Sequence, residues 1–436
     1  MTRRAVALLL LFVMPKALLL AASLHPRYGE CVGSDVWLYY ATAAKQFAAV
    51  VRGENFFERW DFEYPPLAFV LLDLPSRISG LLWPTEPISL AAYAFAFRAL
   101  MFGCDALIFV LLARLPGGGR AVWRRALVYQ ALTLLLAPVL YDRFDLAMTA
   151  PLAAALVASV HPRGHRYAPW LLTLATHVKL IPALVAPWIL LNSPSGERVT
   201  NARTPWRNAR GATLAYLCGT LALASGFWLL WGNGAFRFLG YHADRGLQIE
   251  SAWASVIAWM RVARGAALPI EVQFGAWQLQ DAAAVASAAT LVLLGVLVVL
   301  AAWRLRDLGA PTDHDEGNRA ALKLTVALLA ILLSSKVLSP QFLIWLCPFL
   351  AWIAALPRTN AIIALSLVCA ALTTLIFPVT YTIWVVAEHV ETRGVLTLTG
   401  LLLITLRNLL LLALFVLLLL RWRRADACAH NTTQQR

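Results

Sequence analysis

A single carboxylate and three widely spaced cations are the side chains of this sequence best suited to chemistry. Asp35 precedes Val36–Val51, a stretch with the pattern of an amphipathic helix. Lys179, Arg245 and Lys336 each lie beside apolar runs. One carboxylate suits a general base that takes a proton from an attacking hydroxyl. Cations suit a phosphate that is held and stabilised as it leaves, and the His and Cys spacings match no metal motif.

The composition places these residues in a membrane protein. The chain has 436 residues, of which 60% are hydrophobic and 14% are charged. A soluble domain averages about 45–50% apolar and about 25% charged residues. Ala282–Trp303 and Val395–Leu420 reach the length of roughly 20 apolar residues that spans a bilayer. We therefore expect an all-α polytopic membrane protein, with residues 1–436 as one integral membrane domain.

The net charge of +14 is explained by membrane topology rather than by nucleic acid. No soluble nucleic-acid module or basic helix with interleaved aromatics is present, so we expect no nucleic-acid partner. Basic residues concentrate in cytoplasmic segments because they resist translocation. Arg3 and Arg4 at one end of the chain, and Arg421, Arg423 and Arg424 at the other, predict that both termini are cytoplasmic.

Eleven apolar runs predict the spans, and an odd number would separate the termini. The runs lie near 4–24, 88–113, 122–140, 146–160, 168–191, 211–231, 280–303, 320–335, 341–356, 359–380 and 398–420. The run 168–191 contains Lys179, Pro182 and Pro187, which interrupt a helix. We predict two short helices meeting near Lys179, which is tolerated beside a cavity. The prediction is then about 12 transmembrane helices, within a range of 10–13.

This topology brings the polar clusters to one extracytoplasmic face. A long first loop, 25–87, carries interfacial helices, and a second large loop covers 232–279; segments 192–210 and 306–318 are cytoplasmic. With Asp35 and the three cations, the candidate site residues on the outer face are Glu63, Tyr64, Asp142, Arg143, Asp145, His242, Glu250 and Gln341. Ionisable groups at membrane depth are costly and usually functional, so their shared side predicts a cavity that opens outward.

Each cluster also has an ordinary structural interpretation. Asp35 could only cap the helix that follows it. The turn 142–145 could be a self-satisfied surface turn. Lys179 and Lys336 could reach outer headgroups, and Arg245 could form an exposed ion pair with Glu250.

Six stretches occur together in the order of a known family. They are Asp35-Val-Trp-Leu-Tyr-Tyr-Ala, Phe62-Glu-Tyr-Pro-Pro-Leu-Ala, Asp142-Arg-Phe-Asp-Leu, Lys179-Leu-Ile-Pro, Arg245-Gly-Leu-Gln-Ile-Glu-Ser and Leu338-Ser-Pro-Gln-Phe-Leu-Ile-Trp. In these stretches the chain resembles the glycosyltransferase-C superfamily, and within it the eighty-seventh family, the polyprenyl-phosphate-mannose-dependent mannosyltransferases. Many superfamily members have paired acids in the first loop, whereas Ser34-Asp35 supplies one.

The resemblance implies a reaction and assigns roles. It implies an inverting, metal-independent transfer from a polyprenyl-phosphate sugar, with mannose expected and an α-linked product, at the outer face of the plasma (inner) membrane. Asp35 would be the base. Lys179, Arg245, Lys336 and His242 would bind the donor phosphate. The sugar or acceptor would contact Glu63, Tyr64, Asp142, Arg143, Asp145, Glu250 and Gln341. No cofactor is implied; the partners are the bilayer, the lipid donor and a glycolipid or glycan acceptor.

Two other functions fit the same charges. A secondary transporter with an outward-facing charged cavity is one, and a lipid-phosphate binder or flippase is the other. Long outer loops favour an enzyme whose acceptor arrives from outside, and a binder gives Asp35 no role. The sequence leaves the acceptor, the sugar and the oligomeric state open.

Overall fold

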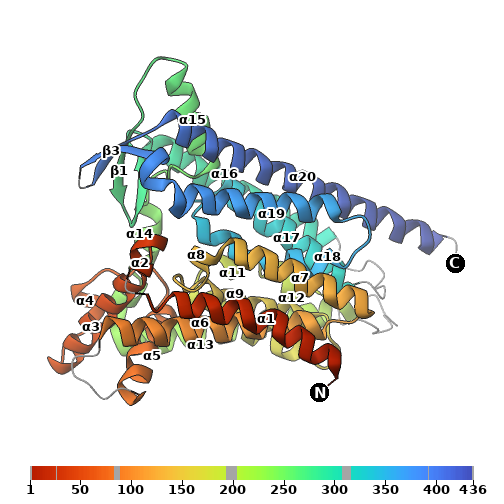
Figure 1. The fold of residues 1–436 in the computed structure, drawn as a ribbon. Coiled ribbons are helices and arrows are strands. Elements are labelled where there is room, and N and C mark those ends of the chain that lie inside the picture. Colours follow the sequence, from red (N-terminus) through yellow and green to blue (C-terminus); the bar gives the residue numbers. More distant parts are fainter. Residues whose placement is uncertain are drawn as a thin grey trace.

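The fold is a bundle of helices with a small sheet at one end (Figure 1). The computed structural model describes residues 2–25, 27–82, 89–192, 204–306, 316–390 and 392–434. Within these ranges seven helices are long and apolar enough to cross a membrane. Residues 83–87 of the predicted first loop, and most of the predicted cytoplasmic segments 192–210 and 306–318, lie outside the described residues.

Each of the eleven predicted runs contains helix in the structure. The helices in these runs are α1 (Arg3–Ala22), α6 (Leu90–Arg114), α7 (Gly119–Leu135), α9 (Asp145–Ser159), α10 (Ala168–Val178), α11 (Ile181–Leu184), α12 (Pro187–Leu190), α13 (Thr204–Trp231), α16 (Ala283–Arg306), α17 (Glu316–Ser334), α18 (Cys347–Ala354), α19 (Asn360–Thr374) and α20 (Leu398–Gln434). The short 3-10 helix η3 (Pro340–Trp345) leads into α18.

The connecting segments contain further helices and four strands. The helices of these segments are α2 (Tyr28–Val32), α3 (Val36–Val51), α4 (Phe56–Arg59), α5 (Pro66–Leu82), α14 (Phe238–Asp244) and α15 (Ala252–Val262). The short helix α8 (Ala137–Leu140) ends the predicted run 122–140. The strands are β1 (Pro269–Gln273), β2 (Ala276–Leu279), β3 (Val386–Val390) and β4 (Arg393–Leu396). They form one antiparallel sheet in the order β2-β1-β4-β3. Our all-helical expectation did not include this sheet, which joins the second large loop to the segment before α20.

The bundle has two ends, which we call the terminal end and the sheet end. Both chain termini lie at the same end, the terminal end, and β1, β3 and α2–α4 lie at the opposite one, the sheet end (Figure 1). At the sheet end, Arg98 Nη1 donates a hydrogen bond to the Ser23 carbonyl (2.9 Å). Asn192 Nδ2 donates to Ser159 Oγ (2.9 Å) at the far end of α9.

The predicted break in 168–191 is present. Helix α10 ends at Val178, Lys179 has extended backbone (φ −149°, ψ 148°), and α11 and α12 follow, each with a proline in its first turn. Asn192 donates a hydrogen bond to Ser159 at the end of α9. The chain therefore runs from Ser159 to Lys179 and then returns to the end of the bundle where Ser159 lies. The prolines and Lys179 thus prevent one continuous helix. Lys179 lies at the point where the chain reverses direction.

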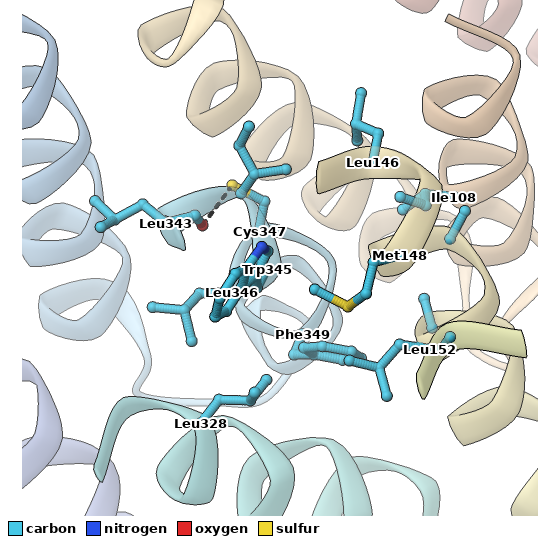
Figure 2. Close-up of a cluster of buried hydrophobic side chains, with 14 of the residues drawn as sticks. Ile108, Leu146, Met148, Leu152, Leu328, Leu343, Trp345, Leu346, Cys347 and Phe349 are labelled. Atoms are coloured by element: carbon cyan, nitrogen blue, oxygen red, sulfur yellow. Dashed lines mark hydrogen bonds between the residues drawn. The ribbon is translucent and has the colours of Figure 1, made fainter. Parts of the chain in front are cut away.

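Apolar side chains fill the bundle and also cover its outside. Figure 2 shows Ile108 of α6, Met148 of α9, Leu328 of α17, Trp345 of η3 and Phe349 of α18 packed together in the interior. The outward faces of the long helices carry exposed leucines, including Leu18, Leu229, Leu291 and Leu409. A water-soluble bundle would place polar residues there. This distribution is that of a predominantly α-helical membrane protein.

A buried polar network explains the lysine inside the first apolar run. Lys16 Nζ lies 3.2 Å from Asp105 Oδ2 and donates a hydrogen bond to Thr133 Oγ1 (2.8 Å). The hydroxyls of Tyr129 and Tyr141 both donate to Asp105 (2.6 Å each). An isolated lysine would be costly at this depth, and this network supplies it with a partner charge on α6.

Candidate active site

The turn that carries Asp35 is fixed by its neighbours. Helix α3 begins directly after Asp35, but the Asp35 side chain makes no capping hydrogen bond. Ser34 Oγ instead accepts a hydrogen bond from the Val36 N–H (3.2 Å). Asp35 Oδ1 lies 2.9 Å from Arg143 Nη1, and its side chain is 37% exposed. Capping therefore does not occupy this carboxylate, which is paired with a guanidinium and accessible.

Asp142 binds the turn that carries Asp35 through Ser34. Its Oδ1 accepts hydrogen bonds from Ser34 Oγ (2.5 Å) and from Arg98 Nη2 (2.6 Å). Arg143 Nη2 donates to the Gly33 carbonyl (2.9 Å). Gly33 has φ +56°, and a Cβ there would lie 2.8 Å from the Phe377 ring. We expected Asp142 to contact a sugar, but its side chain is fully buried. Its carboxylate binds Arg98 and Ser34 instead, and these contacts fix the turn that carries Asp35.

Lys179 lies in a cage of aromatic rings with one carboxylate. Its Nζ is 2.7 Å from Asp145 Oδ1, which also accepts a hydrogen bond from Trp345 Nε1 (2.6 Å). The ammonium lies 4.7 Å from the centre of the Phe144 ring and 5.4 Å from that of Tyr64. Asp145 is buried, so it holds Lys179 rather than facing a sugar as we expected. The turn 142–145 is thus a buried junction and not a surface turn.

Arg245 and Lys336 carry charge without a carboxylate partner. Among the described residues no Asp or Glu oxygen lies within ion-pair distance of either side chain. Arg245 Nε is buried without a hydrogen-bond partner, and Lys336 Nζ donates to the Ala243 carbonyl (3.0 Å). The Gln248 N–H donates to the Lys336 carbonyl (3.1 Å), which ties the two cationic segments together. An anion entering here would meet two charges that have no acidic ion-pair partner among the described residues.

The predicted residues line one cavity of about 1420 Å³, at the sheet end. Ten of them contribute to its wall: Asp35, Glu63, Tyr64, Arg143, Lys179, His242, Arg245, Glu250, Lys336 and Gln341. Asp142 and Asp145 lie behind that wall. Apolar residues extend the lining, among them Ile181 and Leu184 of the short helix α11 and Leu293 of the long helix α16. Pockets for one small ligand measure about 300–1,000 Å³, so this cavity has room for more than a monosaccharide.

Glu250 is not part of an exposed pair with Arg245. It is buried, and its Oε2 accepts a hydrogen bond from Arg407 Nη1 of α20 (2.8 Å). The exposed-pair interpretation is therefore wrong. Glu250 pairs instead with this distant arginine, 157 positions away in the chain.

The surroundings of the cavity shift the pKa values of several lining residues, among them Asp35, His242 and Lys336. Burial and the charge of Arg245 lower the pKa of Lys336. Burial raises the pKa of Asp35; Arg143 opposes the rise, whereas Glu63 and Asp145 add to it. Burial, assisted by the charges of Arg245 and Lys179, lowers the pKa of His242 to about 4. His242 is therefore neutral near pH 7, so its ring can form a hydrogen bond but adds no charge to the cavity.

Sequence reasoning missed the residues that hold the site: Ser34, Arg98, Gln248 and Arg407. Arg98 and Arg407 carried one signal, because each is a charge inside an apolar run and such charges need partners. Gln248 and Ser34 carried no signal in the sequence except that they lie next to predicted site residues.

Comparisons with known proteins found no match: no family model, no curated protein and no solved structure matches this chain. Among the described residues, no group of three or more His, Cys, Asp or Glu side chains could hold a metal ion.

Proposed function

We propose that this protein is an inverting glycosyltransferase that uses a polyprenyl-phosphate sugar. One observation carries the proposal: an accessible carboxylate, Asp35, shares a cavity with the cations Arg245 and Lys336, which have no acidic partner among the described residues. That pairing suits a base that accepts a proton and cations that accept a phosphate. The family resemblance supplies the polyprenyl chain and the expectation of mannose.

In the proposed reaction the acceptor hydroxyl attacks the anomeric carbon of the sugar. The new bond joins that carbon to the acceptor oxygen, and the bond from the carbon to the phosphate oxygen breaks. Asp35 takes the hydroxyl proton. The leaving phosphate monoester gains negative charge, which Arg245, Lys336 and Lys179 stabilise while neutral His242 donates a hydrogen bond. Glu63, Tyr64 and Gln341 are the cavity residues available to sugar hydroxyls.

The apolar part of the cavity supports a lipid-linked donor. Ile181 and Leu184 follow Lys179 in the chain, and Leu293 lies on the long helix α16. These apolar residues line the same cavity as the charged groups. A phosphate at the cations would thus have an apolar path beside it for its polyprenyl chain. Mannose remains the expected sugar, and a glycolipid or glycan the expected acceptor.

The direct test is a transfer assay with purified protein. Labelled polyprenyl-phosphate mannose is incubated with the protein and a membrane extract, and the labelled product is identified. We expect an α-linked glycoside. A transporter would move solute in vesicles and form no glycoside. A flippase would move the labelled lipid between leaflets unchanged, and either outcome would replace our proposal.

We also propose a topology of about twelve crossings with both termini in the cytoplasm. Two of the crossings are α10 and the returning segment 181–190. In cells whose native cysteines are replaced, Arg52→Cys and Arg264→Cys should react with a membrane-impermeant thiol reagent. Arg163→Cys and Arg358→Cys should react only after the cells are permeabilised. All four positions are exposed, so labelling of Arg163→Cys in intact cells would contradict this topology.

We expect loss of either Arg245 or Lys336 to weaken use of the donor. Arg245→Ala and Lys336→Ala each remove a charged hydrogen bond worth about 1.5–3 kcal/mol. This corresponds to a rise of roughly 10- to 150-fold in the KM for the lipid donor, measured in the transfer assay. Arg237→Ala is the matched control, because Arg237 is exposed and 3.6 Å from Asp61. Unchanged donor KM in both variants would remove the phosphate site.

The acidic limb of the pH profile should move in opposite directions in two variants. Transfer requires ionised Asp35, so kcat falls as the pH drops through the pKa of Asp35. Arg143 lowers this pKa and Glu63 raises it. Arg143→Gln should therefore shift the limb to higher pH, and Glu63→Gln should shift it to lower pH. Measurement of kcat from pH 4 to 9 tests this; shifts of the same sign would exclude Asp35 as the titrating group.

A further inference from the structure

The segment Arg245–Ser251 is held by contacts on two sides. On one side, Gln248 Oε1 accepts a hydrogen bond from the Leu338 N–H (3.0 Å), and its Nε2 donates to Ser339 Oγ (3.2 Å). These bonds join the segment to the chain that follows Lys336. A Cβ at Gly246 would collide with the side chain of Gln278, so the backbone passes close to β2. The segment carrying Arg245 is therefore fitted closely to its surroundings.

On the other side the segment is held by α20. Arg407 is fully buried; its Nη1 donates to Glu250 Oε2 (2.8 Å) and its Nη2 to the Glu250 carbonyl (2.5 Å). Asn408 Nδ2 donates to the same carbonyl (3.2 Å) and to Ser255 Oγ (3.0 Å). Arg407 thus grips both the side chain and the backbone of Glu250. A guanidinium is suited to this because its several N–H groups form a rigid fork.

A charge in this position is costly to keep. Taking a carboxylate and a guanidinium out of water carries a penalty that their attraction often fails to exceed. Apolar residues of similar size would therefore satisfy the packing of α20 as well. Arg407 does not line the cavity, whereas Glu250 and Gln248 do. The specific effect of the Arg407–Glu250 pair is to fix the position of the segment 245–251 in the cavity wall.

We propose that Arg407 is a positioning residue that acts through Glu250 to hold Arg245 at the donor phosphate. Its kinetic consequence rests on the proposed transferase function. Arg407 touches no substrate; it sets the backbone from which Arg245 and Gln248 project. Small displacements of positioned groups cost up to about 100-fold in rate or binding, so a loosened segment should weaken donor use before it affects the Asp35 turn.

The test compares two fully buried cations. Arg407→Met and Lys16→Met each remove a buried partner of one carboxylate, so both should lower the melting temperature in detergent. Only Arg407→Met should raise the KM for polyprenyl-phosphate mannose, by about 10- to 100-fold, with a smaller change in kcat. Arg407→Lys keeps the charge but loses the fork and should give an intermediate KM. Equal KM values in Arg407→Met and Lys16→Met would overturn the proposal.

A second measurement needs no substrate, and it tests the proposal even if Arg407→Met does not fold. In hydrogen–deuterium exchange, amides of 245–251 should exchange faster in Arg407→Lys than in the wild type, and remain as protected in Lys16→Met. Unchanged exchange in Arg407→Lys would overturn the positioning role. If the wild type transfers no sugar from this donor, the proposed function fails, while the exchange result still decides whether Arg407 holds the segment.

Discussion

Asp35→Asn should lower turnover by about two to four orders of magnitude, the usual contribution of a general base. Asparagine keeps the size of the side chain and can still accept a hydrogen bond from Arg143, but it cannot take a proton at neutral pH. Because Asp35 makes no capping bond, α3 loses nothing in the exchange. We therefore expect a protein that folds, binds donor and transfers very slowly, as measured by kcat in the transfer assay.

The control for this variant is another carboxylate of the same loop. Asp61 is 76% exposed in its side chain and pairs weakly with Arg237, so Asp61→Asn should retain kcat. Full activity of Asp35→Asn would remove Asp35 from the mechanism and direct attention to Glu63, which lines the same cavity. Loss of activity in both variants would indicate a general need for charge in the loop.

Lys179→Met should destabilise the protein by about 3–5 kcal/mol, because it leaves the buried Asp145 carboxylate without its partner. The melting temperature in detergent measures this loss. In Lys179→Met/Asp145→Asn neither charge is left alone, and Trp345 Nε1 can still donate to the amide oxygen. The double variant should therefore recover most of the lost stability.

The double variant also separates two roles of Lys179. Its ammonium has three N–H donors, and Asp145 takes one of them, while the residue also lines the cavity. If the remaining donors serve the phosphate, the double variant should be stable and at least about 10-fold less active. Wild-type activity in the double variant would make Lys179 purely a partner of Asp145.

Local features of the sequence predicted the parts of the site that depend on neighbours in the chain. The prolines after Lys179 interrupt the helix by removing backbone donors, and that effect is visible in any short window. The position of Asp35 directly before α3 is likewise local. For these residues both the element and the place on it could be stated in advance.

Pairing between distant residues could not be predicted in the same way. Asp142 and Asp145 belong to one turn, yet their partners are Arg98 on α6 and Lys179 in the break after α10. A sequence shows that such charges need partners but not which partner packing supplies. For the same reason both acids were expected to face a sugar. The sheet was missed because its four strands are short and join two loops far apart in the chain.

The contact between Arg407 and Glu250 has a consequence for how the protein is made. Chains emerge from the ribosome from the N-terminus onward, and early parts fold first. Every cavity residue from Asp35 to Gln341 is synthesised before Arg407, which lies on the last described helix, α20. The segment around Glu250 can gain its final anchor only after α20 has been synthesised and inserted. A chain released before that helix would carry all the charged groups of the cavity without the contact that anchors the segment around Glu250.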